Sequence, residues 1–334
     1  MKVLLITSEE RANKFYDLRS LPPDWELVFV GSFPKAEEVL AHADADFVVA
    51  DAVARVGREI IDKMPKLQLI HSEGVGYEGF DAEAARERGI FVCNCAGVNA
   101  GAVAEQAILL MLAVLRRLVE GDAMVRAAQQ IRAKERYILD GLSELGAMKV
   151  GLIGLGAIGK ETAKRLRAFG SEVYYTGRRR RPEETERAHG VTYLPLDALL
   201  ASCDIVSVHI ASNKETFRFV GEAELRGMKP GAILINTARG ELVDGDALAR
   251  ALREGRLAAA GLDTLYPEPV QPDNPLLHLP EALRHRLTLS PHIGGTTIQS
   301  FHRAHRMIWQ NLLACAAGET PKNVVWQGQE TGEG

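Results

Sequence analysis

The chain has few cysteines, and this shortage excludes a disulfide-rich or zinc-bound protein. Only 4 of its 334 residues are cysteine. They lie far apart except for Cys93 and Cys95, whose single-residue spacing does not match the two-residue spacer of redox and zinc motifs. Because no second cluster completes a tetrahedral site, we expect reduced structural thiols and no metal centre.

Long hydrophobic runs are also missing. The longest apolar stretch covers only residues 107–115, whereas a transmembrane helix needs about 20 apolar residues. This stretch therefore predicts a buried helix. Residues 1–7 form a short apolar run without the features of a signal peptide, and they predict a first strand. We expect a cytoplasmic protein with no membrane partner.

Neither sign of charge is in large excess. The formal net charge is -4, with 46% hydrophobic and 25% charged residues. This balance is typical of a globular protein with substantial cores. It argues against a protein that coats nucleic acid. The length is sufficient for two domains of ordinary size.

Short β-branched runs alternate with longer amphipathic stretches, which is the pattern of parallel sheets covered by helices. The strands predicted in the first part of the chain are Val3–Ile6, Glu26–Val30, Phe47–Ala50, Leu67–His71 and Ile90–Cys93. A second series is predicted at Lys149–Ile153, Glu172–Thr176, Thr192–Leu194, Asp204–His209, Ala232–Asn236, Ala258–Asp263 and Leu287–Ser290. The sequence therefore predicts two α/β units in series.

Several helices are predicted between and after these strands. Residues 36–42 and 81–88 are helical candidates in the first series. The stretch 102–118 is apolar around most of its circumference, which is typical of a helix between layers or at a subunit interface. A last helix is predicted over 297–316, followed by a polar tail, 327–334, that we expect to be disordered.

A glycine turn, Gly154-Leu155-Gly156-Ala157-Ile158-Gly159, stands between the strand 149–153 and the helical stretch 157–169. In this context the GxGxxG pattern indicates a dinucleotide site. Gly154 permits the tight turn, Gly156 lets the backbone approach the pyrophosphate, and Gly159 lets the helix pack on the strand. The amides at the start of the helix face the phosphates. A ligand-free glycine turn is the alternative.

The next strand bears on the choice of dinucleotide. An acidic residue at its end would accept hydrogen bonds from the ribose hydroxyls of NAD. This chain has Gly177 there, followed by Arg178-Arg179-Arg180-Arg181. Arginines supply charge-assisted forks for a 2′-phosphate. We therefore predict a preference for NADPH, with NADH still possible. A solvated arginine loop is the alternative.

Three polar residues follow later strands of the second series: Arg239, Glu268 and His292. An open parallel sheet places its ligand crevice at such positions. These residue types suit the reduction of a 2-keto acid. Arg239 can bind the carboxylate and polarise the keto oxygen, and His292 can protonate that oxygen. Glu268 would orient the imidazole and favour its protonated form. Taken singly, each has an alternative as an ordinary loop residue.

These segments resemble the D-isomer-specific 2-hydroxyacid dehydrogenases. The resemblance covers nearly the whole chain, beginning at Gly74-Val75-Gly76 and continuing through 97–99 and 103–105 to the three catalytic segments in family order. It implies two Rossmann-like, doubly wound α/β domains. A cofactor domain, 99–291, would be inserted into a discontinuous, flavodoxin-like substrate domain formed by 1–98 and 292–334. It also implies a homodimer through the cofactor domain.

The resemblance further assigns residues to ligands. The amides of Val75 and Gly76, with Arg239, would bind the substrate carboxylate, and Asp263 would hydrogen-bond the nicotinamide carboxamide. The full set implied for the cofactor is Gly154, Gly156, Ala157, Ile158, Gly159, Thr176, Arg178, Arg179, Ile210, Ala211, Thr237, Ala238, Asp263 and Gly294.

The arginine run is most similar to that of the glyoxylate/hydroxypyruvate reductases, which implies a small keto acid as substrate. A keto acid with a bulkier side chain or a phosphoglycerate-type substrate is an alternative, although long phosphoglycerate dehydrogenases usually carry a further C-terminal domain. Phosphite oxidation is another activity in this family, and it goes with a lysine in the early substrate turn. This chain has Val75 at the comparable position, which argues against that activity. A dinucleotide-sensing, corepressor-like binding protein is the alternative of another class. Glu73, just before the turn, departs from the family pattern, and we expect its side chain to point outward.

Overall fold

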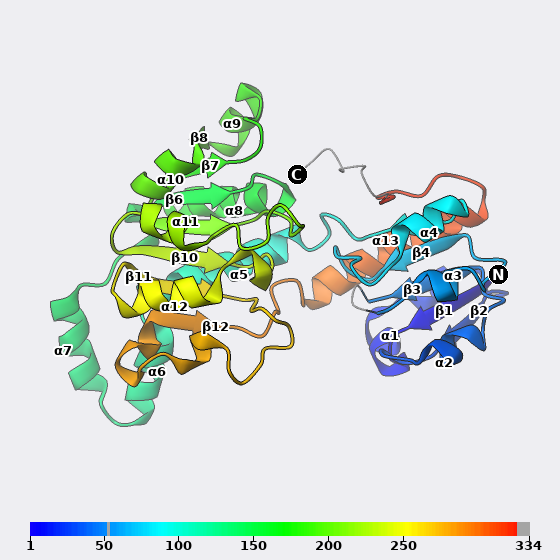
Figure 1. Ribbon diagram of the computed structural model, residues 1–334, viewed down its shortest axis with the longest axis horizontal. Helices are drawn as coiled ribbons and strands as arrows, with labels where there is room; N and C mark the ends of the chain where they lie inside the picture. The colour runs from blue at the N-terminus through cyan, green and yellow to red at the C-terminus, as the bar shows by residue number, and fades with distance from the viewer. Residues whose placement is uncertain (52–53, 326–334) are drawn as a thin grey trace. The chain divides into compact units, whose positions relative to one another are not determined.

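The computed structural model describes residues 1–51 and 54–325, which divide into two compact units (Figure 1). Within the described residues, unit 1 comprises 1–99 and 296–325, and unit 2 comprises Ala100–Gly295. His292 therefore belongs to unit 2, together with Arg239 and Glu268. The tail that the sequence predicts to be disordered lies outside the described residues.

Unit 1 is built on a five-stranded parallel sheet with the strand order β2-β1-β3-β4-β5. This is the flavodoxin-like order 2-1-3-4-5. The strands are β1 (Lys2–Ile6), β2 (Glu26–Phe29), β3 (Phe47–Ala50), β4 (Leu69–Ser72) and β5 (Phe91–Cys93). The helices are α1 (Glu9–Phe15), α2 (Ala36–Leu40), α3 (Arg58–Ile61), α4 (Ala82–Glu87) and α13 (Ile298–Ala316).

Alternation along the strands of unit 1 explains its two cores. Val3 and Leu5 of β1 pack with α1 and α13 on one face of the sheet, whereas Leu4 and Ile6 pack with α2, α3 and α4 on the other. Successive side chains of a strand point to opposite faces, so a strand buried on both faces must be apolar throughout. This is why β1 has no polar residue after Lys2.

Unit 2 contains a seven-stranded parallel sheet with the order β12-β11-β10-β9-β6-β7-β8. Counted from β6, this is the Rossmann order extended by one strand. The strands are β6 (Lys149–Ile153), β7 (Glu172–Thr176), β8 (Thr192–Tyr193), β9 (Ile205–Val208), β10 (Ala232–Asn236), β11 (Leu257–Leu262) and β12 (Leu287–Leu289). The helices are α5 (Ala100–Leu115), α6 (Leu118–Arg126), α7 (Gln130–Asp140), α8 (Ala157–Phe169), α9 (Glu183–His189), α10 (Leu196–Ser202), α11 (Glu222–Gly227) and α12 (Gly245–Arg253).

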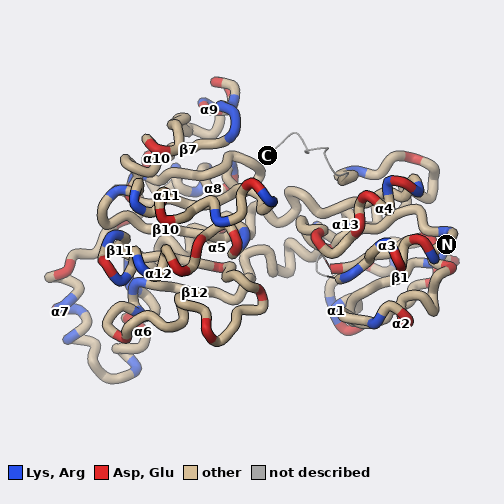
Figure 2. The backbone as a smooth tube through the Cα atoms, in the orientation of Figure 1, with Lys and Arg blue, Asp and Glu red and all other residues tan. Residues whose placement is uncertain are grey.

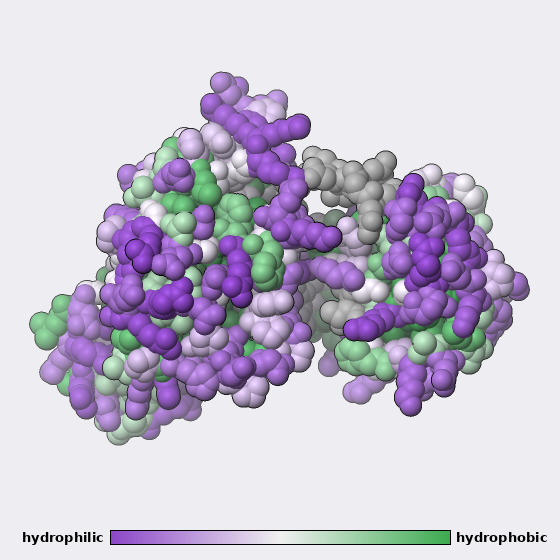
Figure 3. Space-filling view, viewed as in Figure 1, coloured by the Kyte–Doolittle hydropathy of each residue, from purple (hydrophilic) through white to green (hydrophobic). Residues whose placement is uncertain are grey.

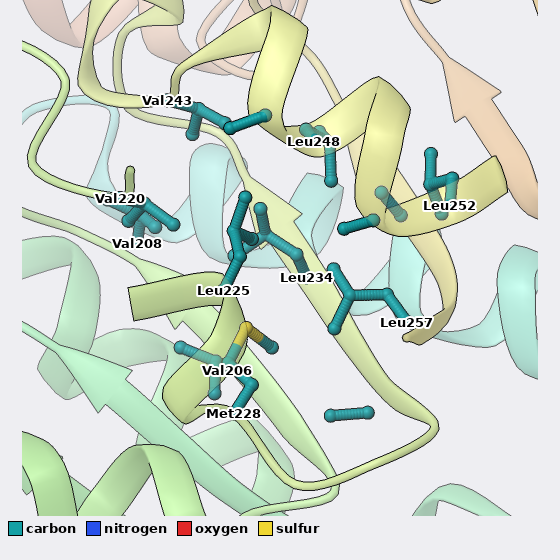
Figure 4. Close-up of a cluster of buried hydrophobic side chains, with 14 of the residues drawn as sticks. Val206, Val208, Val220, Leu225, Met228, Leu234, Val243, Leu248, Leu252 and Leu257 are labelled. Atoms are coloured by element: carbon teal, nitrogen blue, oxygen red, sulfur yellow. The ribbon is translucent and has the colours of Figure 1, made fainter. Parts of the chain in front are cut away.

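Helices cover both faces of this sheet. Helices α5 and α8 pack on one face, while α10, α11 and α12 enclose the second core, which includes Leu234, Leu248 and Leu252 (Figure 4). Short 3₁₀ segments complete the described elements of the chain at Leu18–Ser20, Leu145–Ala147, Gly240–Leu242, Pro275–His278 and Glu281–Arg286.

The predicted helix 102–118 is shorter at its C-terminal end than expected. It ends at Leu115, and Arg117 takes a left-handed conformation with φ 48° before α6 begins. A non-glycine residue in this conformation interrupts an α-helix. The sequence has no glycine or proline at this point, so the end of the helix could not be predicted from local residues.

The four cysteines are buried and free. Burial raises the pKa of the Cys93 and Cys95 thiols to about 12, so both remain protonated and unreactive at neutral pH. Of the helices in residues 1–51 and 54–325, none is long and apolar enough to cross a membrane.

Candidate active site

The predicted functional residues of unit 2 share one edge of its sheet. Six strands end level with one another, because their last residues are register partners: Thr176, Ile153, Val208, Asn236, Leu262 and Leu289. The segments that follow these residues therefore emerge side by side. The glycine turn follows β6, at the point where the sheet order reverses between β6 and β9, and Arg239, Glu268 and His292 follow β10, β11 and β12. Parallel sheets bind ligands at this edge.

The glycine turn fits a dinucleotide pyrophosphate. Gly154 has φ +104°, and a Cβ there would lie 2.7 Å from the carbonyl oxygen of His209. A Cβ at Gly159 would overlap the carbonyl oxygen of Gly154. Only glycine is tolerated at such positions, so the backbone can form the close turn. Helix α8 begins at Ala157 with no side-chain cap at Gly156, which leaves its first amides directed at the turn.

Two more predicted cofactor residues adjoin this turn. The carbonyl oxygen of Thr176 accepts a hydrogen bond of 2.9 Å from the amide of Gly154. The Cγ2 atom of Ile210 would lie 3.0 Å from a Cβ at Gly154. The turn therefore lies next to both the end of β7 and the end of β9.

The arginine run does not act as a unit. Arg180 makes a bidentate ion pair with Glu186, with Nε–Oε1 and NH2–Oε2 distances of 2.9 and 2.8 Å. This pairing holds the pKa of Glu186 at about 2. The amide of Arg181 donates to the hydroxyl of Tyr175. Arg178 and Arg179 are exposed between β7 and α9, where Lys and Arg gather (Figure 2). Of the run, Arg178 and Arg179 are the first two arginines after β7 and are exposed.

His292 and Glu268 are in direct contact. The Nδ1 atom of His292 lies 2.8 and 2.9 Å from the two carboxylate oxygens of Glu268. Nδ1–H therefore donates to the carboxylate, which fixes the ring and leaves Nε2 for a substrate. Both side chains are partly exposed, at 38% and 55%. This arrangement can transfer a proton to or from a bound molecule.

The backbone of His292 is held in an unfavourable conformation. Its φ is +56°, in the left-handed region that costs a non-glycine residue on the order of 1–3 kcal/mol. Its amide donates a hydrogen bond of 2.8 Å to the carbonyl oxygen of Asp263, which holds the residue in place. Such strain persists only where surrounding contacts enforce it.

Asp263 anchors the whole loop that carries His292. Its carboxylate is buried and accepts hydrogen bonds from the hydroxyl of Ser290 at 2.5 Å and from the amides of Ile293 and Gly294 at 3.1 and 2.8 Å. Gln106 of α5 donates to Ser290 at 2.8 Å and approaches Asp263 at 3.5 Å. The predicted contact of Asp263 with the nicotinamide remains a prediction.

Replacing Asp263 by asparagine is expected to loosen this loop. The amide nitrogen of the new side chain cannot accept a hydrogen bond, so one buried donor of the loop loses its partner at a cost of about 1–3 kcal/mol. We expect kcat to fall by about tenfold or more as His292 loses its fixed position, and the melting temperature to fall by several degrees. The exposed Asp273→Asn variant is the matched control. Unchanged kcat and melting temperature for Asp263→Asn would contradict the anchoring role.

The segment that carries Arg239 is fixed by Asn236. The buried Asn236 side chain accepts from the amide of Ala238 at 3.0 Å and donates to the carbonyl oxygen of Arg239 at 2.8 Å. A Cβ at Gly240 would overlap the backbone of Leu265. The Arg239 segment therefore packs directly against the segment that carries Glu268. The hydroxyl of Thr237, another predicted cofactor residue, is buried without a hydrogen-bond partner among the described residues.

In unit 1, Gly74-Val75-Gly76 follows β4 at the carboxyl edge of that sheet. All three carbonyl oxygens are engaged, by the amide of Cys95, the side chain of Asn94 and the hydroxyl of Ser72. The amides of Val75 and Gly76, by contrast, donate to no acceptor within residues 1–51 and 54–325. A turn with its carbonyls engaged and its amides available is suited to bind an anion.

Glu73 does not point outward, and that expectation is wrong. Its side chain is 1% exposed, and its carboxylate lies 3.5 Å from Arg11 and 3.8 Å from His305. Both partners come from helices distant in the sequence, so the general rule that glutamates are exposed was the only signal available. A buried carboxylate requires such partners because its desolvation is costly.

The family model for the D-isomer specific 2-hydroxyacid dehydrogenase, NAD binding domain, matches residues 108–294. The chain belongs to this family. It is 39% identical over 286 residues to a glyoxylate reductase of Thermococcus litoralis, covering 84% of each chain. It is also 39% identical over 293 residues to a glyoxylate reductase of Thermofilum pendens, covering 87% of this chain and 85% of that one.

Solved structures agree with this membership. A glyoxylate reductase from Paecilomyes thermophila superposes with a TM-score of 0.80 at 30% identity, covering 96% of this chain and 97% of that one. A D-mandelate dehydrogenase from Rhodotorula graminis superposes with a TM-score of 0.85 at 27% identity, covering 97% of each. The family resemblance and the Rossmann-like fold class are thereby confirmed. The protein is a nicotinamide-dependent oxidoreductase acting on 2-hydroxy acids.

Several residues that support the site were not identified from the sequence. Gln106 and Ser290 hold Asp263, while Asn94 and Ser72 hold the carbonyls of the unit 1 turn. They are ordinary polar residues without a motif. Their roles depend on contacts such as Gln106–Asp263, which spans 157 residues of sequence.

Proposed function

We propose that this family member is a reductase of small 2-keto acids, with glyoxylate or hydroxypyruvate as substrate and NADPH as the preferred cofactor. The His292–Glu268 pair is the main support, because it can supply a proton in the segment after β12, and Arg239 follows β10 of the same sheet. The relatives named glyoxylate reductase support a small keto acid as the substrate of this chain.

In this proposal the chain contributes binding, orientation and a proton. When bound, the reduced nicotinamide supplies the hydride. The amides of Val75 and Gly76 bind the substrate carboxylate together with the guanidinium of Arg239, which also polarises the keto oxygen. His292 gives its Nε2 proton to that oxygen as the carbonyl carbon is reduced, and Glu268 stabilises the imidazole in orientation and charge. The product is a 2-hydroxy acid, and the reverse reaction uses His292 as the base.

A substrate panel tests this assignment. Oxidation of NADPH and NADH is followed spectrophotometrically with glyoxylate, hydroxypyruvate, pyruvate and keto acids with larger side chains. We expect the highest kcat/KM with glyoxylate or hydroxypyruvate. A higher value with a bulky keto acid would overturn the substrate assignment but leave the reaction type intact. No turnover with any keto acid would overturn both.

The cofactor preference rests on the end of β7. No carboxylate follows Thr176 there, and Gly177 is succeeded by the exposed Arg178 and Arg179. A carboxylate at this position would repel a 2′-phosphate, whereas exposed guanidinium groups can form charge-assisted hydrogen bonds with it. Arg180 is excluded from this role by its ion pair with Glu186.

Replacing Arg178 and Arg179 by glutamine is expected to lower kcat/KM for NADPH selectively. Hydrogen bonds to charged groups are worth roughly 1.5–3 kcal/mol each, so the loss should be on the order of tenfold or more per arginine. The kcat/KM for NADH should stay within about twofold. The exposed Arg187→Gln on α9 is the matched control. Equal losses with both cofactors would contradict a 2′-phosphate site.

We further propose a homodimer through unit 2. Several apolar side chains of α6 and α7 are exposed, and part of this surface is visible over α7 (Figure 3). They are Leu118, Val119, Val125, Ile131, Ile138 and Leu139. Exposed apolar patches of this kind mark association surfaces. Sedimentation equilibrium should give twice the chain mass, and Leu139→Glu with Ile138→Glu should shift it toward one chain mass. A monomeric wild-type protein would contradict this proposal.

A further inference from the structure

A buried carboxylate, that of Glu73, immediately precedes the predicted substrate turn of unit 1 in the sequence. Glu73 follows β4 and precedes Gly74. The NH2 atom of Arg11 lies 3.5 Å from its Oε2, and Nε2 of His305 lies 3.8 Å from its Oε1. Both separations exceed a direct hydrogen bond, and neither carboxylate oxygen accepts a hydrogen bond from any described residue. The carboxylate is therefore held by charge rather than by a rigid hydrogen-bond network.

Arg11 is the cation that compensates Glu73. Burial lowers the pKa of His305, so its imidazole is neutral near neutral pH. The guanidinium of Arg11 stacks over the ring of Phe301, 5.1 Å from its centroid, which keeps it beside the carboxylate. Arg11 is 30% exposed and also lies 3.8 Å from Asp51, but the 40% exposed Asp51 carboxylate is screened by solvent more than the 1% exposed carboxylate of Glu73.

This pair is close enough to the turn to influence a bound anion. Two residues of chain span at most about 7 Å, so the Cα atoms of Glu73 and Val75 cannot be farther apart than that. This separation is shorter than the Debye length of about 8–10 Å at physiological ionic strength, so salt does not fully screen charges this close. Buried charges are screened less than exposed ones. The side chain of Glu73 is 1% exposed. We infer that the carboxylate of Glu73, and the guanidinium of Arg11 beside it, contribute to the potential at the amides of Val75 and Gly76.

We propose that Glu73 and Arg11 form a charge-compensated pair that prevents the neighbouring turn from favouring dianionic over monoanionic substrates. This inference rests on the proposed function, in which the turn binds the carboxylate of a keto acid. Neither residue touches the reacting atoms, so both are positioning residues that act through the potential at the turn. With Glu73 present, the positive charge of Arg11 is cancelled. Without it, an added negative charge on the substrate would be attracted.

The decisive experiment compares two inhibitors of nearly identical shape, oxamate with one negative charge and oxalate with two. Inhibition constants against glyoxylate are measured near pH 7.5 for the wild-type protein, Glu73→Gln and Glu73→Gln/Arg11→Gln. For Glu73→Gln we expect tighter inhibition, by about threefold for oxamate and about tenfold for oxalate, because the Coulomb energy scales with ligand charge. The double variant should return both constants to within about twofold of wild type.

The controls separate an electrostatic role from a structural one. Glu78→Gln removes an exposed carboxylate just beyond the turn and should change either constant by less than about twofold. The kcat of all variants should stay within about twofold of wild type, because a charge at this distance changes binding more than chemistry. A structural disturbance would instead weaken oxamate and oxalate equally and would persist in the double variant.

Two further outcomes keep the inference open to refutation. If Glu73→Gln does not fold, Arg11→Gln gives the same test with the opposite sign, weakening oxalate more than oxamate. Equal changes for the two inhibitors, in either variant, would overturn the inference. A wild-type protein that reduces no keto acid would instead overturn the proposed function, so the two failures are distinguishable.

Discussion

Replacing His292 by asparagine is expected to lower kcat for keto-acid reduction by roughly 10²–10⁴-fold, the usual contribution of a positioned general acid. Asparagine is chosen because it tolerates the left-handed backbone that His292 adopts. It cannot supply the proton that the keto oxygen requires. Cofactor affinity, measured by fluorescence titration with NADPH, should be unchanged, because the glycine turn and the end of β7 remain intact.

His302→Asn is the matched control for this prediction. His302 is exposed on α13, and its replacement should leave kcat within about twofold of wild type, as is usual for surface substitutions. If His292→Asn retained kcat within about tenfold of wild type, another group would have to supply the proton. The assignment of the acid–base role to His292 would then be wrong.

Replacing Arg239 by glutamine is expected to lower kcat/KM on the order of 10³-fold or more, because an electrostatic stabiliser of the developing oxyanion and a carboxylate ligand are lost together. Arg239→Lys should recover only part of the activity. It keeps the charge but loses the planar fork that matches a carboxylate. Steady-state kinetics with glyoxylate would show a raised KM and a lowered kcat in both variants.

Arg253→Gln on α12 serves as the comparison, since Arg253 is an exposed arginine of the same unit. Its kinetic constants should match those of wild type. A loss confined to KM in Arg239→Gln, with kcat unchanged, would show that Arg239 binds the substrate without stabilising the transition state. That result would remove the polarising role but keep the carboxylate contact.

Much of the fold could be predicted because it depends on patterns that repeat locally. Strands such as β3, β6 and β10 have the predicted bounds, since a parallel strand buried on both faces is an unbroken apolar run. The glycine turn was equally readable. Any side chain at Gly154 or Gly159 would clash with neighbouring backbone atoms. The presence of glycine at these positions therefore indicates the close turn directly.

The remainder depends on contacts between distant segments. The ion pair between Arg180 and Glu186 could not be predicted from the arginine run. It forms because the turn into α9 folds back on β7. The break between α5 and α6 at Arg117 was likewise unpredicted, because no glycine or proline occurs there. The sequence predicted an exposed side chain for Glu73. In the structure, Arg11 of α1 and His305 of α13 lie beside its buried carboxylate.

The sequence by itself determined the class of fold, the dinucleotide turn and the three residue types that suit keto-acid reduction. Only the tertiary structure decided that Glu268 accepts a hydrogen bond from Nδ1 of His292, that Asp263 anchors the loop of His292, and that Arg11 lies beside the buried Glu73. The physical reason is that periodicity and glycine positions report local backbone and burial requirements. Ion pairs and hydrogen bonds depend instead on which strand ends become neighbours, and that follows from the strand order β12-β11-β10-β9-β6-β7-β8.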